Sequence, residues 1–227
     1  MKTHRCIGIF GGTFDPIHFG HLRSALEIYE QFQCEEMRFV PSRQPPHRTP
    51  FASPKHRLAM LRLSLVNTPF ILDTGEMDRE GPSYSIDTLR ALRATYKNAS
   101  LCLIIGQDAF LGLPTWHQWE KLIQLSNIIV MHRSGWIIPE TGVIPGFLKE
   151  HALKPNESLQ NFSSGKILNQ KITGLDISGS EIRNRIQKGL SPQFLLPETV
   201  WEYIKKQKLY DYLDKNAEIQ PMGKILL

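Results

Sequence analysis

Residues 6–22 read Cys-Ile-Gly-Ile-Phe-Gly-Gly-Thr-Phe-Asp-Pro-Ile-His-Phe-Gly-His-Leu, and this stretch decides how the chain begins to fold. The apolar run at residues 4–10 predicts a strand that ends at a pair of glycines. From Leu22 onward, apolar residues recur at offsets of 3, 4 and 7, which predicts a helix over residues 20–32. A strand, a glycine-rich turn and a helix in this order indicate the first unit of a layered α/β protein.

The same alternation continues along the chain. The proline-rich residues 42–54 predict a loop, and Ser53-Pro54 opens the next helix. Strands that alternate with helices imply right-handed crossovers and a doubly wound parallel sheet of the α/β class. Further strands are expected at residues 36–41, 70–73, 101–105 and 127–132, and further helices at residues 86–96 and 116–125.

The last third of the chain carries a weaker pattern. Residues 135–165 predict a mixture of loop and short helix, and residues 172–177 predict a short final strand. Two amphipathic runs at residues 179–188 and 197–206 predict helices. Arg93, inside the apolar stripe of the 86–96 helix, is expected to pack its stem while its charged head reaches water.

Length and composition favour a globular protein. The chain has 227 residues, of which 41% are hydrophobic and 22% charged. We expect one domain over residues 1–214, with a small C-terminal helical part at about residues 179–212, and a flexible tail over residues 215–227. The formal net charge of +5 suits an anionic partner, whether a nucleotide, a nucleic acid or a membrane surface.

Signals for secretion or membrane insertion are weak. No apolar run approaches the length of a membrane span, and the glycine pair interrupts the N-terminal run too early for a signal peptide. The three cysteines, Cys6, Cys34 and Cys102, are odd in number and form no CxxC. They predict neither a disulfide framework nor a zinc ribbon, and they fit a reducing cytoplasm.

The turn after the first strand carries the chemistry. Gly11 and Gly12 let the backbone approach a ligand without a Cβ clash, and the helix that follows presents N–H groups and a positive dipole end to phosphate. His18 and His21 stand at that helix start, where ring N–H groups can donate to phosphate oxygens. The turn is not a P-loop, GxGxxG or HExxH motif, so the sequence does not favour ordinary dinucleotide binding or zinc.

Residues 11–22, Gly-Gly-Thr-Phe-Asp-Pro-Ile-His-Phe-Gly-His-Leu, resemble the (H/T)xGH signature of the nucleotidyltransferase superfamily, and their spelling is similar to that of the bacterial nicotinate-nucleotide adenylyltransferase family. Further blocks follow in the family's order, so that the resemblance covers roughly residues 5–210. They are Pro-Ser-Arg-Gln-Pro-Pro-His at 41–47, Gly-Pro-Ser-Tyr-Ser-Ile-Asp-Thr-Leu at 81–89, Leu-Ile-Ile-Gly-Gln-Asp at 103–108, Leu-Pro-Thr-Trp at 113–116 and Ile-Ser-Gly-Ser-Glu-Ile-Arg at 177–183.

The resemblance implies a Rossmann-like nucleotidyltransferase fold and a reaction of NAD biosynthesis. ATP and nicotinate mononucleotide would give deamido-NAD and pyrophosphate by direct attack on the α-phosphorus, without a covalent intermediate. His18, His21 and Arg183 would be catalytic, because this chemistry needs mainly positioning and charge stabilisation. The residues implied for ATP binding are Gly11, Gly12, Thr13, Phe14, His18, His21, Gly106, Asp108, Ile177, Ser178 and Arg183.

For the pyridine nucleotide, the resemblance implies that the Trp116 indole stacks on the nicotinate ring. Trp119 is expected to pack in the core instead. Backbone N–H groups at Ser85 and His117 would hold the nicotinate carboxylate. The residues implied for binding this substrate are Phe14, His47, Arg48, Tyr84, Ser85, Asp108, Trp116 and His117.

Structural alternatives stand beside several of these assignments. Ser178 and Glu181 also form a capping-box pattern, and capping and anion binding use the same N–H groups. The chain departs from the family's spelling at Gly179, where a serine is common, and at Ser180, where a threonine is common. Asp15 could ligate a cation or fix the turn before Pro16, and it is not assigned as a metal ligand.

The implied partners are ATP and nicotinate mononucleotide, with Mg²⁺ bound mainly through the ATP phosphates. One alternative is a sibling adenylyltransferase that acts on nicotinamide mononucleotide or another phosphate acceptor. Another is a non-catalytic nucleic-acid-binding module, which the scatter of Lys and Arg along the chain disfavours. We expect neither a nucleic-acid nor a membrane partner, and no pattern decides whether the chain forms a homo-oligomer.

Overall fold

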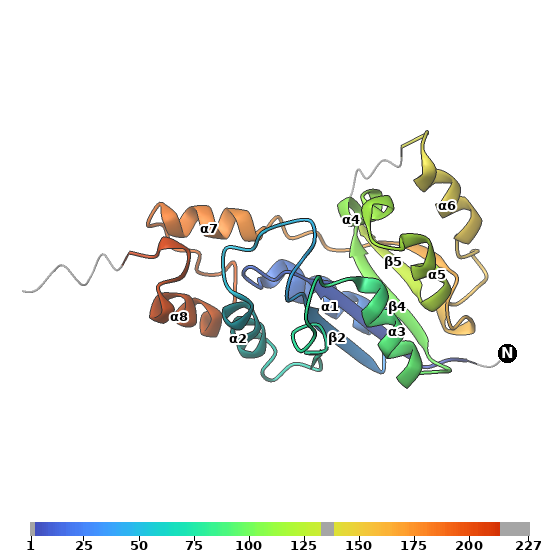
Figure 1. Ribbon diagram of the computed structural model, residues 1–227, viewed down its shortest axis with the longest axis horizontal. Coiled ribbons are helices and arrows are strands. Elements are labelled where there is room, and N and C mark those ends of the chain that lie inside the picture. Colours follow the sequence, from blue (N-terminus) through green and yellow to red (C-terminus); the bar gives the residue numbers. More distant parts are fainter. Residues whose placement is uncertain (1–2, 133–138, 214–227) are drawn as a thin grey trace, which may run out of the picture.

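The computed structural model describes residues 3–132 and 139–213 (Figure 1). Within these residues one all-parallel sheet has the strand order β3-β2-β1-β4-β5-β6. The order reverses between β1 and β4, and such a reversal opens a crevice at the carboxyl ends of the strands. The predicted doubly wound α/β fold is confirmed. The strands are β1 Cys6–Gly12, β2 Glu36–Pro41, β3 Ile71–Leu72, β4 Ser100–Gly106, β5 Asn127–His132 and β6 Ile167–Lys171.

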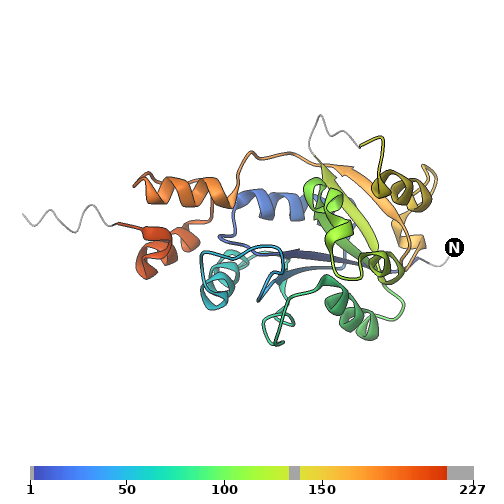
Figure 2. The ribbon, with the colours of Figure 1, turned by 45° about the horizontal axis from the view of Figure 1, so that its top comes forward.

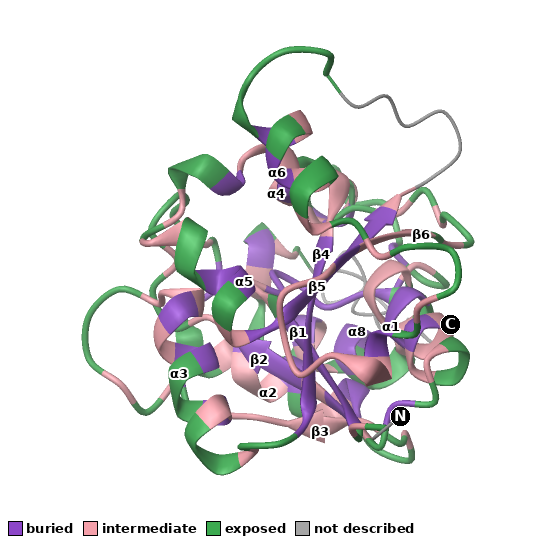
Figure 3. Ribbon diagram, turned by 90° about the vertical axis from the view of Figure 1, so that its right-hand side faces the viewer, coloured by how far each residue is buried: buried purple, intermediate pink, exposed green. Residues whose placement is uncertain are grey.

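The sheet is buried on both faces, which explains the continuous apolar runs of its central strands (Figure 3). Along β4, Cys102 and Ile104 enter one apolar core, while Leu101 and Leu103 enter the other. This alternation follows from the two-residue period of a strand. The central strands therefore form a rigid platform whose carboxyl edge presents the loops.

Helices cover each face of the sheet. The first core is closed by α1 Phe19–Gln31, α2 Pro54–Ser64, α7 Gly179–Gln187 and α8 Glu198–Gln207. The second is closed by α3 Ser85–Thr95, α4 Gln107–Leu111, α5 Leu122–Leu125 and α6 Val143–His151. Short 3₁₀ turns occupy Leu113–Thr115, Trp119–Lys121, Leu159–Asn161 and Leu209–Asp211.

The C-terminal helices lie beyond the carboxyl end of β1, beside the turn that follows this strand. In Figures 1 and 2, α7 and α8 sit at the end of the molecule opposite the N-terminus. The Tyr210 hydroxyl and the Arg183 guanidinium both donate to Asp15, which belongs to the turn after β1. The predicted C-terminal helical part is thus joined directly to the glycine-rich turn.

Two predicted elements were wrong. Residues 172–177 form no strand, because β6 pairs with β5 through Ile167–Lys171. This edge strand carries polar Asn169 and Gln170 and buries only Ile167, so its apolar signal is weak. The helix predicted at residues 116–125 begins later, because Gln118 adopts a left-handed conformation with φ 52° that a helix cannot include.

The remaining predicted strands and helices are confirmed to within a few residues, and α4 was missed because it is one short turn directly after β4. Part of the 135–165 segment and the whole 215–227 tail lie outside the described residues, and the single-domain boundary at residue 214 stays a prediction. No helix in the described ranges has the length and apolarity needed to cross a membrane.

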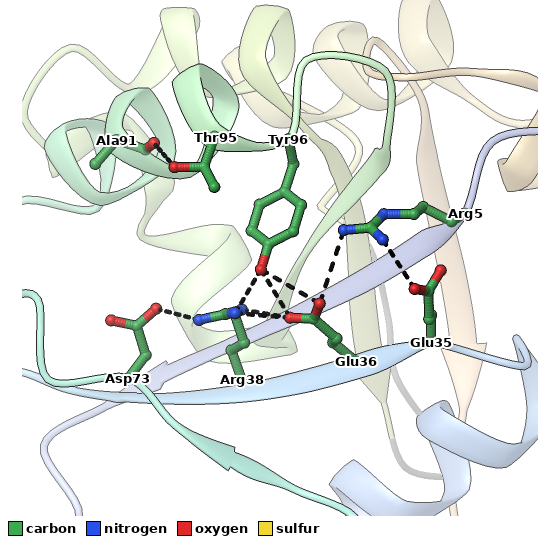
Figure 4. A network of polar contacts seen from close by, with 8 residues as sticks. All are labelled: Arg5, Glu35, Glu36, Arg38, Asp73, Ala91, Thr95 and Tyr96. Carbon is green, nitrogen blue, oxygen red and sulfur yellow. Dashed lines mark hydrogen bonds and ion pairs between the residues drawn. The ribbon is translucent and has the colours of Figure 1, made fainter.

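A polar network covers β2 on the side of α3 (Figure 4). Arg38 pairs with Glu36 at 2.7 Å and with Asp73 at 3.1 Å, and the Tyr96 hydroxyl donates to Glu36 at 2.9 Å. Arg5 pairs with Glu35 at 2.8 Å. Burial alone would lower the pKa of Arg38, but the hydrogen bonds that Arg38 donates to Glu36 and Asp73 raise that pKa. The network joins β2, β3 and the end of α3, and its role is structural.

Arg93 departs from its prediction. Its guanidinium donates to the backbone carbonyls of Leu125 at 2.7 Å, Ser163 at 2.7 Å and Ala99 at 2.8 Å, rather than reaching freely into water. Arg93 therefore connects α3 to the end of α5 and to the segment before β6. A planar guanidinium with several donors is suited to such bridging.

Candidate active site

Three groups of predicted site residues follow the carboxyl ends of β1, β2 and β4. Gly12 at the end of β1 lies opposite Pro41 at the end of β2, and the Ser42 N–H donates to the Gly12 carbonyl at 2.9 Å. Gly106 ends β4, the strand on the other side of β1. The three loops that follow these strands therefore start side by side.

His18 and His21 form a stacked pair at the start of α1. Their ring centroids are 3.7 Å apart with an interplanar angle of 26°. His18 is the buried N-cap residue of the helix, and its backbone N–H donates to Nδ1 of His21 at 3.3 Å. Because Nδ1 of His21 is an acceptor, a neutral His21 carries its proton on Nε2, which is then available as a donor.

The pKa of His21 lies well below its ordinary value of 6.5, first because the ring is desolvated and second because His18 is close. His21 is therefore neutral near pH 7 in the free protein. A neutral imidazole can donate one hydrogen bond, and a bound polyphosphate would favour protonation of the ring.

This depressed pKa predicts a pH dependence of stability. Unfolded His21 binds a proton below about pH 6.5 but folded His21 does not, so the free energy of unfolding should decrease as the pH falls, by at most about 1.4 kcal/mol per pH unit. In His21→Asn this contribution is absent, and the loss of stability between pH 7.5 and pH 5 should be smaller. Urea unfolding at several pH values measures it, and parallel curves for the two proteins would contradict the assignment.

The glycine turn is closely packed around Phe14. A Cβ at Gly12 would lie 2.9 Å from the Phe14 ring, so glycine is required there. The Phe14 ring is buried and meets the His21 ring edge-on at 5.2 Å. Its side chain packs in the core behind the histidine pair, so a ligand contact of Phe14 would use its backbone, while the Thr13 carbonyl already accepts from Arg57 at 2.8 Å.

The Asp15 carboxylate holds the turn after β1 against two other segments of the chain. Its carboxylate accepts from the N–H groups of Phe51 at 2.7 Å and Ala52 at 3.2 Å, and from the Tyr210 hydroxyl at 2.7 Å. Burial and the neighbouring Asp15 raise the pKa of Tyr210, which remains a neutral donor. Of the two interpretations of Asp15, the structure favours the structural one.

The C-terminal motif reaches the same turn. Ser178 caps α7 by accepting from the Glu181 N–H at 3.1 Å, so its capping role is confirmed. Arg183 donates to the Asp15 carbonyl and lies over the Phe51 ring at 4.3 Å. A Cβ at Gly179 would lie 3.0 Å from that same carbonyl, so the glycine at this position permits a close approach of α7. Ile177 lies beside the start of α1, with its carbonyl 3.4 Å from the Cβ position of Gly20.

His47 and Arg48 line a hollow of about 700 Å³ within the loop between β2 and α2. Both side chains are exposed. The hollow continues to Ala52 and Arg57, next to Asp15. The structure thus brings the basic loop beside the glycine turn, as a phosphate-binding role requires, while the role itself stays a prediction.

The residues implied for the pyridine ring form a separate group. The Tyr84 and His117 rings lie 4.4 Å apart, and the half-buried Trp116 packs at the edge of the second core. Trp119 meets Phe147 at 5.0 Å, so its predicted packing role is confirmed. Asp108 is exposed in the first turn of α4, and Ser85 is the first residue of α3. Ser83, one residue before Tyr84, accepts from the N–H groups of Arg43 and Gln44 and donates its own N–H to the Gln44 carbonyl, so the ring group is joined to the 42–54 loop.

One residue that orders the site was missed. Arg57 is fully buried on α2 and donates to carbonyls of the surrounding loops. A sequence signal existed, because Arg57, Met60, Leu61 and Ser64 share the spacing of one buried helix face. A charged residue on such a face must find acceptors inside the protein.

Comparison with known proteins supplies independent information. The cytidylyltransferase-like family matches residues 9–185. A curated protein of Hahella chejuensis, named "Probable nicotinate-nucleotide adenylyltransferase", is 45% identical over 214 residues, which cover 92% of this chain and 98% of that protein. One of the same name from Methylococcus capsulatus is 43% identical over 207 residues, covering 90% and 99%. A solved structure, "Plasmodium falciparum nicotinic acid mononucleotide adenylyltransferase complexed with NaAD", has a TM-score of 0.70 at 21% identity and covers 92% of this chain and 99% of its own, a likeness of fold.

Proposed function

The chain belongs to the nicotinate-nucleotide adenylyltransferase family of cytidylyltransferase-like proteins, and from this membership we propose that it transfers the adenylyl group of ATP to nicotinate mononucleotide. The products are deamido-NAD and pyrophosphate. The observation that carries the proposal is the stacked pair of His18 and His21 at the N-terminus of α1, directly beyond the glycine turn of β1. This arrangement concentrates donors and positive potential where a polyphosphate binds.

The transfer requires one bond to form and one to break. A phosphate oxygen of the mononucleotide attacks the α-phosphorus of ATP, and the bond from that phosphorus to the bridging oxygen of the leaving pyrophosphate breaks. Nε2–H of His21 would donate to the oxygens on which negative charge grows, and Arg183 would hold the departing phosphates. His18 keeps His21 in orientation through its backbone N–H. The protein contributes positioning and charge stabilisation.

We propose Mg²⁺ as the cofactor, carried by the ATP phosphates. The side chains near the turn fit this mode of binding. The carboxylate of Asp15, the nearest candidate ligand, already accepts hydrogen bonds from three protein groups. Across residues 3–132 and 139–213, no group of three His, Cys, Asp or Glu side chains could hold a metal ion. Mg²⁺ often keeps several waters and binds through substrate phosphates, whose charge it neutralises. His18, His21 and Arg183 would hold the phosphates that carry it.

The acceptor would lie toward α3 and α4. Trp116, Tyr84 and His117 supply aromatic surface for the pyridine ring. Ser85 opens α3, and the N–H groups of a first helical turn have no acceptor within the helix, so they favour a carboxylate over an amide. This supports the acid form of the mononucleotide as substrate. Nicotinamide mononucleotide is the competing acceptor.

The test is release of pyrophosphate from ATP and Mg²⁺ with each mononucleotide as acceptor. We expect rapid release with the nicotinate form and slow release with the nicotinamide form. The reverse preference would assign the chain to the amide. Absence of release with both, from protein shown to be folded by circular dichroism, would refute the proposed reaction.

Arg183→Lys tests the proposed role of Arg183 in holding phosphates. Lysine keeps the charge but loses the planar, multi-donor geometry. We therefore expect the KM for ATP to rise and turnover to fall, so that kcat/KM for ATP decreases by about tenfold. Arg185→Lys is the matched control, because Arg185 lies on the same helix and donates to the Ser191 carbonyl. Steady-state kinetics with varied ATP measures both variants. Equal kinetic constants for the two would remove Arg183 from the phosphate site.

We place the reaction in the cytoplasm, which the three free, buried thiols of Cys6, Cys34 and Cys102 support. That the chain binds no nucleic acid stays a prediction. Whether it forms a homo-oligomer stays open. Sedimentation velocity of the full chain, with and without added RNA, measures both.

A further inference from the structure

Arg57 is a buried cation whose acceptors are neutral carbonyls. Its side chain is fully buried, and it donates to the carbonyls of Thr13 at 2.8 Å, Ser42 at 2.6 Å, Arg43 at 2.9 Å and Ala52 at 3.2 Å. Burial lowers the pKa of Arg57, although an arginine remains charged at any pH at which the protein folds. Four of the five guanidinium N–H groups are thus engaged with protein carbonyls, and the buried side chain is placed to hold the loop rather than to bind a substrate.

These four carbonyls belong to two segments of the candidate site. Thr13 lies in the glycine turn that leads to His18 and His21. Ser42, Arg43 and Ala52 lie near the two ends of the loop over residues 42–54, which carries His47 and Arg48. One planar side chain therefore spans the turn and closes the base of the loop.

Asp15 reinforces the same connection from the other side. Its carboxylate holds the N–H groups of Phe51 and Ala52 and the hydroxyl of Tyr210. The pair Arg57 and Asp15, which we name the loop joint, thus fixes the 42–54 loop to the glycine turn through both its carbonyls and its N–H groups. Both side chains are buried, so water does not compete for these bonds.

We propose that Arg57 is a positioning residue for adenylyl transfer, which sets the distance between the phosphate of the mononucleotide and the α-phosphate of ATP. The inference rests on the proposed function, which places the ATP phosphates at the glycine turn, and on the expectation that His47 and Arg48 of the 42–54 loop bind the phosphate of the mononucleotide. An in-line attack depends steeply on such a distance, so a small shift of the loop lowers the rate. Arg57 acts through Thr13, Ser42 and Arg43, not on the reacting atoms.

Arg93 provides a matched control within the same chain. It also donates to several backbone carbonyls, among them those of Leu125, Ser163 and Ala99. Its acceptors precede β4, β5 and β6, at the amino edge of the parallel sheet, whereas the glycine turn and the basic loop follow β1 and β2 at the carboxyl edge. A loss of stability common to any carbonyl-bridging arginine would appear in both variants, whereas a positioning effect would appear only at Arg57.

The kinetic experiment compares Arg57→Lys with Arg93→Lys at equal distance below each melting temperature. We expect both variants to melt earlier than the wild type. Only Arg57→Lys should raise the KM for the mononucleotide and lower turnover, with kcat/KM at least tenfold below that of Arg93→Lys. Kinetic constants within twofold of each other would overturn the proposal. Should Arg57→Lys not fold, Tyr210→Phe loosens the joint through Asp15, and wild-type kinetics from that variant would overturn the proposal as well.

Trypsin cleavage tests the joint without any activity. Arg57 holds the Arg43 carbonyl, which is the carbonyl that trypsin attacks when it cuts after Arg43. We expect cleavage at Arg43 to be at least fivefold faster in Arg57→Lys than in Arg93→Lys, while cleavage at the exposed Lys188, outside the 42–54 loop, serves as the internal reference. Equal rates at Arg43 would overturn the joint. A wild type inactive on both mononucleotides, with fast cleavage only in Arg57→Lys, would instead refute the proposed function and keep the joint.

Discussion

With His21 replaced by alanine, turnover should fall by about 100-fold or more while the fold is kept, because the variant loses a donor to charge that grows in the transition state. The structure gives the reason for this magnitude. Nδ1 of His21 is occupied by the His18 N–H, so Nε2–H is the donor, and the desolvated ring makes its hydrogen bond in a medium of low polarity. Since the bond strengthens as charge builds, the loss should appear in kcat more than in the KM for ATP.

The measurement is steady-state pyrophosphate release, with His56→Ala as the matched control. His56 is also a half-buried histidine, but its ring pairs with the Tyr203 hydroxyl at 3.0 Å between α2 and α8. That variant should lose some stability and keep its turnover. If His21→Ala turned over within threefold of His56→Ala, the donor role of His21 would be rejected.

The depth of burial decided which parts of the fold could be predicted. The bounds of β2 and β5 were predicted without error, because β2 ends at a proline and β5 is a short, nearly continuous apolar run. β6 was misplaced because an edge strand buries few side chains and shows little pattern. The late start of the helix after Gln118 was missed, because the residue type does not reveal a left-handed conformation unless the residue is glycine.

The candidate site divides in the same way. His18, His21 and Arg183 could be proposed as candidates because their motifs are contiguous in sequence, and their roles stay predictions. The spacing of α2 marks Arg57 as buried, but the partners of Arg57 and Tyr210 could not be predicted, because the Thr13 carbonyl and the Asp15 carboxylate are far away in sequence. A short motif records which residues face the ligand. It does not record which buried residues hold that motif in place.

Trp116→Ala should raise the KM for nicotinate mononucleotide by about 10- to 100-fold, the loss expected for one base stacked on an aromatic face, at about 1–3 kcal/mol. The KM for ATP should change little, because Trp116 lies on the segment after β4, apart from the histidine pair. The indole is half-buried at the rim of the second core, so one part of it packs and another part remains for a ligand. Turnover at saturating substrate should therefore stay within a fewfold of the wild type.

Trp119→Ala separates stacking from packing. Trp119 lies three residues further along and contacts Phe147 edge-on at 5.0 Å, so its loss should lower the free energy of unfolding by about 1–3 kcal/mol, less than for a fully buried aromatic residue. The KM for the mononucleotide should remain near that of the wild type. Urea unfolding and mononucleotide titration of both variants give opposite patterns if the assignment is right. Equal KM values would mean that both indoles only pack, and the pyridine ring would then have to be sought beside Tyr84 and His117.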